Sequence, residues 1–410
     1  MKLKILLNWD TSRKDLFEPF ITLKSDFEFV VLYNRSPSNK PSIHPFKEIY
    51  FDSFLTPYDV LRLVKPDRII FFNINSFPQI ALNRAAKNIG IQTFLMHHGI
   101  HSSDVLRLSQ VRADLGLDKK SKHTKSFKTL LFYLLALRFK NYKEFWKYLR
   151  FPITMNKNHR TIALHKSSFD AILPTKIIQL SPYNSKYTKS IYGFIDDKIF
   201  VYIGHPSFDK IIHRFKELVN SVIKRNNPYF LLIDFPNIEN NMGYKIVGFE
   251  RKLLFYKKLA SAAKQHGCRL KIKLHPAGYD SELNYVDDSN IDIITETDIA
   301  KLIFEAKVCL SFYSTLLIPI IYQKKFCYVF HFGLQIGLQT DLVELGLVKL
   351  LSLDDFTAED LHSDNYFLNY DAQSYKTFID RYLYFVDGKS TERLKMVLEK
   401  GDLAKNHNKN

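Results

Sequence analysis

The sequence has 410 residues, more than one ordinary hydrophobic core accommodates, and this length predicts two domains. Hydrophobic residues make up 46% of the chain and charged residues 25%, with little glycine or proline, which excludes a disordered chain and a fibrous repeat. The formal net charge of +17 requires an anionic partner, which is nucleic acid, anionic lipid or a phosphate-bearing substrate.

Sequence patterns exclude one class of partner and indicate the cellular compartment. There is no zinc-finger spacing and no ribonucleoprotein motif, so no nucleic-acid partner is expected. The three cysteines lack CxxC spacing and predict buried free thiols in a reducing compartment, which favours the cytoplasm. The first apolar run is too short for a signal peptide, and no segment has the ~20 apolar residues that span a bilayer. We therefore expect a cytoplasmic protein that is at most peripheral at the inner membrane.

The first half of the chain alternates strand-like apolar runs with helical stretches, which predicts a parallel sheet flanked by helices. A helix expected over Gln79–Gly90 precedes the fourth strand, and His97-His98-Gly99 follows that strand. Because open α/β sheets bind ligands at the carboxyl ends of their strands, this loop is a candidate site. The four predicted strands are Lys4–Asn8, Phe27–Tyr33, Arg68–Asn73 and Gln92–Met96.

Residues 119–150 interrupt this alternation and predict an inserted helical pair. The stretch carries ten Lys and Arg residues against the single acid Glu144. A basic helical pair with aromatic side chains could lie on an anionic membrane surface. It could equally be a helical hairpin of the core whose charges face water. The aromatic residues in question are Tyr142, Phe145, Trp146 and Tyr148.

The remainder of the chain predicts a second α/β domain. Strand-like runs at 169–173 and 198–206 complete the first domain, and 371–399 is expected to form a closing helical segment. We predict domains over 1–208 and 209–385, followed by a helix end and polar tail over 386–410. The predicted strands of the second domain are Tyr229–Asp234, Arg269–Leu274, Ile291–Ile294, Val308–Ser311 and Phe326–Phe330. Its predicted helices are Lys210–Arg225, Arg251–His266, Asp298–Ala306 and Thr315–Tyr322.

The end of the strand at 269–274 carries the first candidate binding residues. His275 follows the strand directly, and Pro276 prevents the chain from continuing as a helix. The imidazole of His275 can donate to a phosphate oxygen, and Lys273 can add positive charge at the same place.

The strand at 308–311 leads into a helix through a second candidate site. Ser311, Ser314 and Thr315 place small hydroxyl groups at this junction. Hydroxyl groups and free backbone N–H groups at the positive end of a helix dipole can bind a phosphate. We also expect Ser314 or Thr315 to be the N-cap of the helix.

Together, Lys273-Leu274-His275-Pro276, the helix led by Asp298 and the strand running into Ser314-Thr315 resemble a known family. They resemble the donor domain of bacterial GT-B glycosyltransferases of capsule and lipopolysaccharide synthesis, above all the sialyl- and polysialyltransferases that use CMP-nonulosonic acids. The resemblance implies two Rossmann-like domains facing an interdomain cleft. It further implies contacts between CMP and His275-Pro276 and Ser314-Thr315. It covers residues 190–335 well, the N-terminal sheet loosely and 119–150 not at all.

The N-terminal domain departs from these relatives at the catalytic base. Where they carry an acidic pair before a glycine, this chain has His97-His98-Gly99, which is closer to the His-Gly loop of capsule and teichoic-acid glycerophosphotransferases. His98 can take the proton of an acceptor hydroxyl, and Asp10 and Asp104 are the carboxylate alternatives. The histidines lack a zinc spacing and no DxD pair is evident, so we predict transfer without a metal or other cofactor.

The sequence therefore predicts an inverting glycosyltransferase with His98 or Asp10 as base. The donor would be a nucleotide sugar, first of all a CMP-linked nonulosonic acid such as sialic or pseudaminic acid. The acceptor would be a capsule or lipopolysaccharide glycan, either free or in a lipid-linked precursor form. The alternatives are a CDP-polyol phosphotransferase and a non-catalytic scaffold of glycan assembly.

Overall fold

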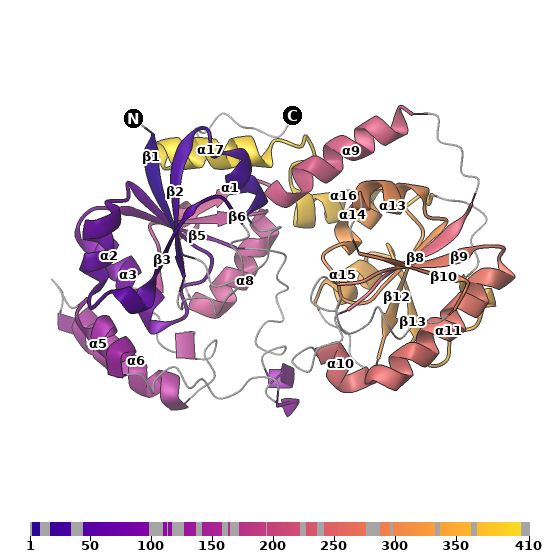
Figure 1. Ribbon diagram of the computed structural model, residues 1–410, viewed down its shortest axis with the longest axis horizontal. Coiled ribbons are helices and arrows are strands. Elements are labelled where there is room, and N and C mark those ends of the chain that lie inside the picture. The colour runs from indigo at the N-terminus through magenta and orange to yellow at the C-terminus, as the bar shows by residue number, and fades with distance from the viewer. Residues whose placement is uncertain are drawn as a thin grey trace. The chain divides into compact units, whose positions relative to one another are not determined.

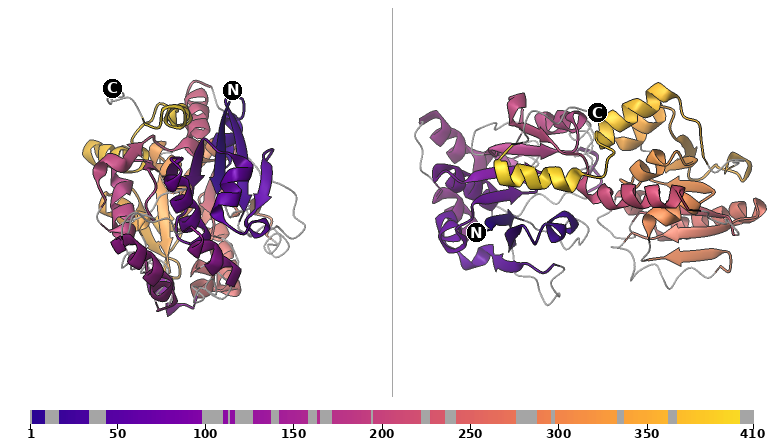
Figure 2. Two further views of the ribbon diagram at one scale, coloured as in Figure 1. Left: turned by 90° about the vertical axis from the view of Figure 1, so that its left-hand side faces the viewer. Right: turned by 90° about the horizontal axis from the view of Figure 1, so that it is seen from above.

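The computed structural model describes residues 2–8, 17–33, 44–97, 110–112, 114–116, 127–136, 142–157, 163–164, 172–193, 195–221, 227–235, 242–275, 288–295, 298–332, 337–361 and 367–402. The chain divides into two compact units. The first unit comprises Met1–Ser109, Asp118–Ser207 and Lys389–Asn410, and the second comprises Gln110–Leu117 and Phe208–Gly388. Each unit contains one parallel sheet with helices on both faces, as Figures 1 and 2 show.

The sheet of the first unit has seven strands in the order β3-β2-β1-β4-β5-β6-β7, all paired in parallel. Successive strands are added in one direction from β1 to β3 and in the other direction from β4 to β7, so the switch lies between β1 and β4. The strands are β1 (Leu3–Asn8), β2 (Phe27–Tyr33), β3 (Lys47–Tyr50), β4 (Arg68–Phe71), β5 (Gln92–Met96), β6 (Lys176–Gln179) and β7 (Phe200–Tyr202). The helices are α1 (Glu18–Thr22), α2 (Pro57–Val64), α3 (Phe77–Asn88), α5 (Phe127–Leu134), α6 (Tyr142–Lys157), α8 (Pro182–Tyr192) and α17 (Ser390–Lys400).

The sheet of the second unit has six parallel strands in the order β10-β9-β8-β11-β12-β13. Successive strands are added in one direction from β8 to β10 and in the other direction from β11 to β13, so the switch lies between β8 and β11. The strands are β8 (Tyr229–Ile233), β9 (Arg269–Lys273), β10 (Ile291–Ile294), β11 (Val308–Ser311), β12 (Cys327–His331) and β13 (Lys349–Ser352). The helices are α9 (Asp209–Val219), α10 (Met242–Val247), α11 (Phe249–Gln265), α13 (Ile299–Glu305), α14 (Leu317–Tyr322), α15 (Leu338–Glu344) and α16 (Ala372–Phe378), which continues as a π-helical turn over Ile379–Leu383.

Local sequence signals explain where the helices begin and end. At the start of α2, the Thr56 hydroxyl accepts from the Asp59 backbone N–H at 3.1 Å while the Asp59 carboxylate accepts from the Thr56 N–H at 2.9 Å. This capping box, followed by Pro57 in the first turn, satisfies backbone donors that a helix start leaves without partners. Lys65 ends the helix in the left-handed conformation with φ of 50°.

The inserted helices α5 and α6 pack into the core of the first unit against α3. The rings of Tyr133 and Tyr148 are stacked at 3.9 Å, and each hydroxyl donates to the backbone carbonyl of the other residue at 2.8 Å. Phe77 of α3 lies 5.0 Å from the Tyr133 ring. Tyr148 is therefore a core residue, as the core-hairpin alternative predicts for this position. Trp146, in contrast, is 43% exposed.

The C-terminal helix α17 belongs to the first unit and packs on its sheet, whereas the preceding residues, up to Gly388, belong to the second unit. Leu394, Val397 and Leu398 are buried in one cluster with Ile5 and other strand residues. The closing segment predicted over 371–399 is helical in two parts, because the helical geometry is interrupted between the π-helical turn and α17. Tyr384 and Gly388 both adopt positive φ in this break, which ends helical geometry.

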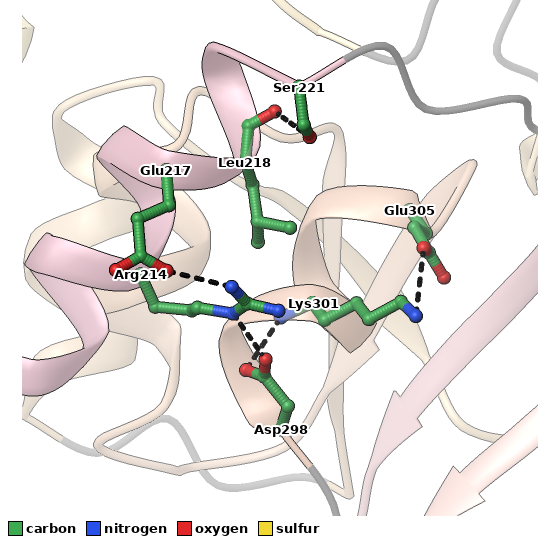
Figure 3. Close-up of polar contacts among 7 residues, drawn as sticks. All are labelled: Arg214, Glu217, Leu218, Ser221, Asp298, Lys301 and Glu305. Atoms are coloured by element: carbon green, nitrogen blue, oxygen red, sulfur yellow. Dashed lines mark hydrogen bonds and ion pairs between the residues drawn. The ribbon is translucent and has the colours of Figure 1, made fainter.

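Helix α9 and the start of α13 are joined by a surface ion pair (Figure 3). Arg214 of α9 contacts Asp298 at 2.6 Å and Glu217 at 2.7 Å. Asp298 is also the N-cap of α13, since its carboxylate accepts from the Lys301 backbone N–H at 3.1 Å. One carboxylate thus caps α13 and connects it to α9.

Candidate functional site

The sheet of the second unit has its topological switch point between β8 and β11. At such a point the connections on either side leave in opposite directions, which opens a crevice at the carboxyl ends of the strands. Ser311, the last residue of β11, is paired with Ile233 of β8 and with Val329 of β12. The residues that directly follow these strands therefore belong to the candidate site.

The predicted binding residues on β9 have different surroundings. The ammonium of Lys273 donates to the carbonyl oxygens of Leu274 at 3.1 Å and Thr295 at 2.6 Å. These contacts connect the adjoining ends of β9 and β10. His275 is half-buried and lies two residues beyond the end of β9, the strand that neighbours β8. Pro276 lies outside the described residues.

The predicted residues after β11 form a turn before α14. The helix begins at Leu317, so the prediction that Ser314 or Thr315 is its N-cap residue is wrong by one or two positions. Turn hydrogen bonds run from Leu317 N–H to the Ser314 carbonyl and from Ile318 N–H to the Thr315 carbonyl. The Ser314 hydroxyl still accepts from the Leu316 N–H at 3.2 Å. Thr315 is exposed.

A buried ionic cluster adjoins the switch point at the end of β8. Asp234 contacts the Lys252 ammonium at 2.7 Å, and the two side chains are 0% and 2% exposed. Tyr256 donates to the same carboxylate oxygen, Oδ2. Lys252 also donates to the Phe235 carbonyl at 2.8 Å and lies 4.5 Å from the centre of the Phe235 ring.

Lys252 and Tyr256 were not predicted as site residues. Both lie on α11, where the buried residues Lys252, Phe255, Tyr256 and Leu259 follow helical i, i+3, i+4, i+7 spacing. A lysine in the middle of such an apolar stripe is the signal in the sequence that could have revealed a buried charge. Its partner, Asp234, was predicted only as the last residue of the strand Tyr229–Asp234.

Three buried side-chain oxygens in the described part of the second unit have no hydrogen-bond partner: Asp234 Oδ1, Ser311 Oγ and Gln339 Oε1. Gln339 belongs to α15, and its Nε2 donates to the Phe330 carbonyl of β12 at 3.4 Å. Asp234 and Ser311 thus lie at the carboxyl ends of β8 and β11, and Gln339 contacts the backbone of β12. Leaving a buried polar atom without a partner costs about 1–3 kcal/mol.

Two of the predicted base residues follow strands of the first sheet along the chain, Asp10 after β1 and His98 after β5. His98, Asp10 and Asp104 lie outside the described residues. His97 is buried after β5, and its Nε2 lies 3.1 Å from the Thr188 hydroxyl, which also accepts from Gln179 at 2.6 Å. These contacts make His97 a structural residue of the first unit.

His205, three residues after β7, is buried, and desolvation lowers its pKa from 6.5 to about 4. Its imidazole is therefore neutral near pH 7. Across the described residues, no three His, Cys, Asp or Glu side chains are grouped as a metal site would require. None of the helices in the described ranges is both long and apolar enough to cross a membrane.

No protein-family model and no curated protein matches the sequence. Solved structures match it over almost its whole length. The glycotransferase of kitacinnamycin is 13% identical with a TM-score of 0.53, over 98% of this chain and 99% of that chain. The calicheamicin glycosyltransferase CalG4 is 12% identical with a TM-score of 0.55, over 97% and 99%.

The wall teichoic acid polymerase TagF, as the H444N variant soaked with CDPG, is 13% identical with a TM-score of 0.53, over 98% of this chain and 89% of that chain. At such low identity these likenesses concern the fold. Together with the two doubly wound sheets, they confirm the predicted class: the chain has the GT-B fold, built from two Rossmann-like α/β domains.

Proposed function

We propose that this chain is a glycosyltransferase whose second unit binds a nucleotide-activated donor at the carboxyl edge of its sheet. The observation that carries the proposal is the switch point between β8 and β11, where buried apolar strands end in Asp234 and in the Ser311–Ser314 turn. His275 follows the neighbouring strand β9. Open α/β sheets bind nucleotides at this position. The GT-B fold shared with CalG4 and the glycotransferase of kitacinnamycin supports the reaction class.

In this proposal His275 and the Ser314-Thr315 turn hold the phosphate of the donor. The imidazole N–H of His275 and the hydroxyl of Thr315, which is exposed, can donate to phosphate oxygens. These donors would stabilise the negative charge that develops on the leaving nucleotide when the bond to the sugar breaks. Transfer would need no metal, and the rate should therefore be unchanged by a chelator.

The base of the proposed reaction comes from the first unit. His98 or Asp10 would remove the proton from the acceptor hydroxyl as its oxygen attacks the anomeric carbon, which inverts the configuration at that carbon. Replacing His98 with Ala and Asp10 with Asn, one at a time, tests this assignment. The base is the residue whose loss lowers kcat by at least about 100-fold while the Kd for nucleotide stays unchanged.

The first donor to test is a CMP-linked nonulosonic acid, transferred to a capsule or lipopolysaccharide glycan. This choice rests on the sequence resemblance of His275-Pro276 and Ser314-Thr315 to the sialyl- and polysialyltransferases. A CDP-polyol donor is the second candidate, favoured by the likeness to TagF, whose structure was determined with CDPG, and by His97-His98-Gly99. Both donors carry cytidine, so CMP and CDP should stabilise the protein more than UDP and GDP.

The test combines nucleotide binding with turnover. Thermal shift with CMP, CDP, UDP and GDP identifies the nucleotide, because a ligand at 100 times its Kd stabilises by about 2.7 kcal/mol. Release of CMP or CDP from donor and acceptor then measures transfer. His275→Ala should weaken nucleotide binding at least about tenfold, a change of about 1.4 kcal/mol. An unchanged affinity and rate would remove His275 from the site.

His266→Ala is the matched control for His275→Ala. His266 Nε2 contacts the Ala358 carbonyl at 2.8 Å, and this histidine precedes β9 and lies at the opposite, amino edge of the sheet. Its loss should leave nucleotide affinity unchanged. If no nucleotide stabilises the wild-type protein, the chain is instead a non-catalytic scaffold with the GT-B fold.

We also propose that 119–150 binds the anionic surface of the inner membrane. The exposed side chains on α6 and after α5 include apolar Trp146, Ile153 and Leu135, together with basic Lys147 and Arg150. Apolar and basic groups on one surface are typical of interfacial helices. Replacing Trp146 and Ile153 with Ser should abolish sedimentation with phosphatidylglycerol vesicles and spare soluble turnover. Unchanged sedimentation would contradict this assignment.

A further inference from the structure

We propose that Tyr313 is a positioning residue of the donor site, whose hydroxyl group holds the turn carrying Ser314 and Thr315 in place for the donor phosphate. This inference rests on the proposed function and deepens it, because Tyr313 would act on the phosphate through its neighbours in the chain. Tyr313 lies two residues beyond the end of β11 and directly before Ser314.

The turn between β11 and α14 contains short-range hydrogen bonds. The Leu317 N–H donates to the Ser314 carbonyl, and the Leu316 N–H donates to the hydroxyl of the same serine at 3.2 Å. The Ile318 N–H donates to the Thr315 carbonyl. These bonds join residues two or three positions apart, so they determine the shape of the turn. Its position relative to the neighbouring elements depends on side chains that reach beyond it.

The side chain of Tyr313 reaches from this turn to two other elements of the second unit. Its hydroxyl accepts from the Gly243 N–H of α10 at 2.9 Å. Its ring meets the ring of Phe332, the residue that follows β12, edge to face with the centroids 5.8 Å apart. Tyr313 thereby connects the turn to α10 and to the end of β12.

The hydrogen bond between Tyr313 and Gly243 is one that water does not readily replace. Gly243 is the second residue of α10 and is buried. The first N–H groups of a helix have no partner within the helix, so they need an acceptor from elsewhere. The Tyr313 hydroxyl provides that acceptor, and removing it would leave the N–H of a buried residue without this bond. The bond therefore restrains the turn relative to α10.

A phosphate site depends on such a restraint because hydrogen bonds are short and directional. The donor and acceptor atoms must lie about 2.7–3.2 Å apart, and binding groups must be held to within about 0.5 Å. The Tyr313 hydroxyl oxygen is directed to α10, at 2.9 Å from the Gly243 nitrogen. We therefore assign Tyr313 a role through the turn and not a direct contact with the nucleotide.

Tyr313→Phe tests this role, because it removes only the hydroxyl and keeps the ring against Phe332. The probes are CMP, CDP, UDP and GDP, measured by calorimetry on the full chain. The nucleotide that binds the wild-type protein should bind Tyr313→Phe about three- to tenfold more weakly. In a Thr315→Val background the same change should weaken binding by less than about twofold, because the hydroxyl that Tyr313 positions is already absent.

Hydrogen exchange in α10 gives a readout that a merely structural role would not change. If Tyr313 links the turn to α10, a nucleotide that orders the turn should slow exchange of the α10 backbone N–H groups in the wild-type protein. Tyr313→Phe should abolish this slowing at saturating nucleotide. Slowing that persists in Tyr313→Phe would contradict the link, as would its absence from the wild-type protein.

Tyr229→Phe is the matched control. The Tyr229 hydroxyl donates to the Leu302 carbonyl at 2.8 Å, and Tyr229 is the first residue of β8, at the amino edge of the same sheet. Both variants remove one phenol hydroxyl that is hydrogen-bonded to the backbone. Only Tyr313→Phe should change the nucleotide affinity.

The outcomes separate this inference from the proposed function. If Tyr313→Phe leaves the affinity unchanged while His275→Ala weakens it, Tyr313 is not a positioning residue and the donor site stands. If Tyr313→Phe weakens binding equally in the Thr315→Val background, Tyr313 contacts the nucleotide directly and the positioning role is wrong. If Thr315→Val alone has no effect, the turn does not bind the phosphate and the inference fails, while His275 stays in the site. If no nucleotide binds the wild-type protein, the donor site and the inference both fail.

Discussion

The buried pair of Asp234 and Lys252 gives the largest stability effect that we expect from a single substitution. Lys252→Met keeps the apolar stem of the side chain and removes its charge. The carboxylate of Asp234, 0% exposed, then loses the ammonium at 2.7 Å, and the Phe235 carbonyl loses a donor at 2.8 Å. Removing one partner of a buried ion pair costs about 3–5 kcal/mol, because the other charge remains buried without compensation. We expect a loss of that size in the second unit.

The control is an ion pair of similar length at the surface. Arg214 lies 2.6 Å from Asp298 and 2.7 Å from Glu217, and its side chain is 42% exposed (Figure 3). Solvent screens such a pair, so Arg214→Met should cost at most about 1 kcal/mol. The double change Lys252→Met with Asp234→Leu removes both buried charges, and it should recover most of the stability that Lys252→Met loses.

Two units make a single unfolding free energy hard to interpret, so the assay must resolve the second unit. Hydrogen exchange followed by mass spectrometry reports the opening free energy of peptides from β8 and α11, and urea unfolding by circular dichroism gives the overall change. The reasoning is refuted if Lys252→Met costs no more than Arg214→Met in the β8 peptide. It is also refuted if the double variant is less stable than Lys252→Met.

Three further predictions concern pH, thiols and backbone strain. Burial lowers the pKa of His205 to about 4 in the folded state, so the unfolded chain binds the extra proton first as pH falls. The stability that neutral His205 contributes is complete above pH 6.5, and about 3 kcal/mol of it is lost between pH 6.5 and about 4. His205→Gln should flatten that part of a plot of urea midpoint against pH. A plot identical to that of the wild-type protein would contradict the burial of His205. Thiol titration with an aromatic disulfide should find none of the cysteines reactive in the folded protein and three after denaturation, since all are buried: Cys268, Cys309 and Cys327. Rapid labelling of a folded thiol would exclude that burial. Gly388→Ala should destabilise by more than about 1 kcal/mol, because φ is +79° and the added Cβ would lie 2.7 Å from His213 Nε2. Gly346→Ala, with φ of +66° and nothing within 4 Å, incurs only the backbone strain and should cost less in the same thermal scan.

The buried strands were predictable because their signal is local. Phe27–Tyr33, Gln92–Met96 and Val308–Ser311 were predicted with the bounds that the structure shows, since each is a short, largely apolar or β-branched run. Strands β3 (Lys47–Tyr50), β6 (Lys176–Gln179) and β13 (Lys349–Ser352) were missed. Each has only four residues and a mixture of polar and apolar side chains, so period and composition do not distinguish it from a loop.

The candidate site likewise contains residues that the sequence could identify and one whose contacts it could not. Ser311, Ser314 and His275 could be named from the sequence, because each follows or ends a strong strand signal and strand ends bind ligands in this class of sheet. The contacts of Lys273 could not be predicted. Its position suggested a phosphate ligand, whereas its ammonium contacts the Leu274 and Thr295 carbonyls, which only the pairing of β9 with β10 brings together.

By itself, the sequence determined the class of fold and the strand ends that carry polar groups, because hydrophobic periodicity and turn residues act over a few positions. The tertiary structure decided which of those groups have partners. Tyr148 was placed in the core rather than at an interface, and Asp234 received Lys252 from a helix 18 residues along the chain. It also left Ser311 Oγ without a partner in the described structure. Partners of this kind depend on strand order and helix packing, which bring together residues that no local pattern connects.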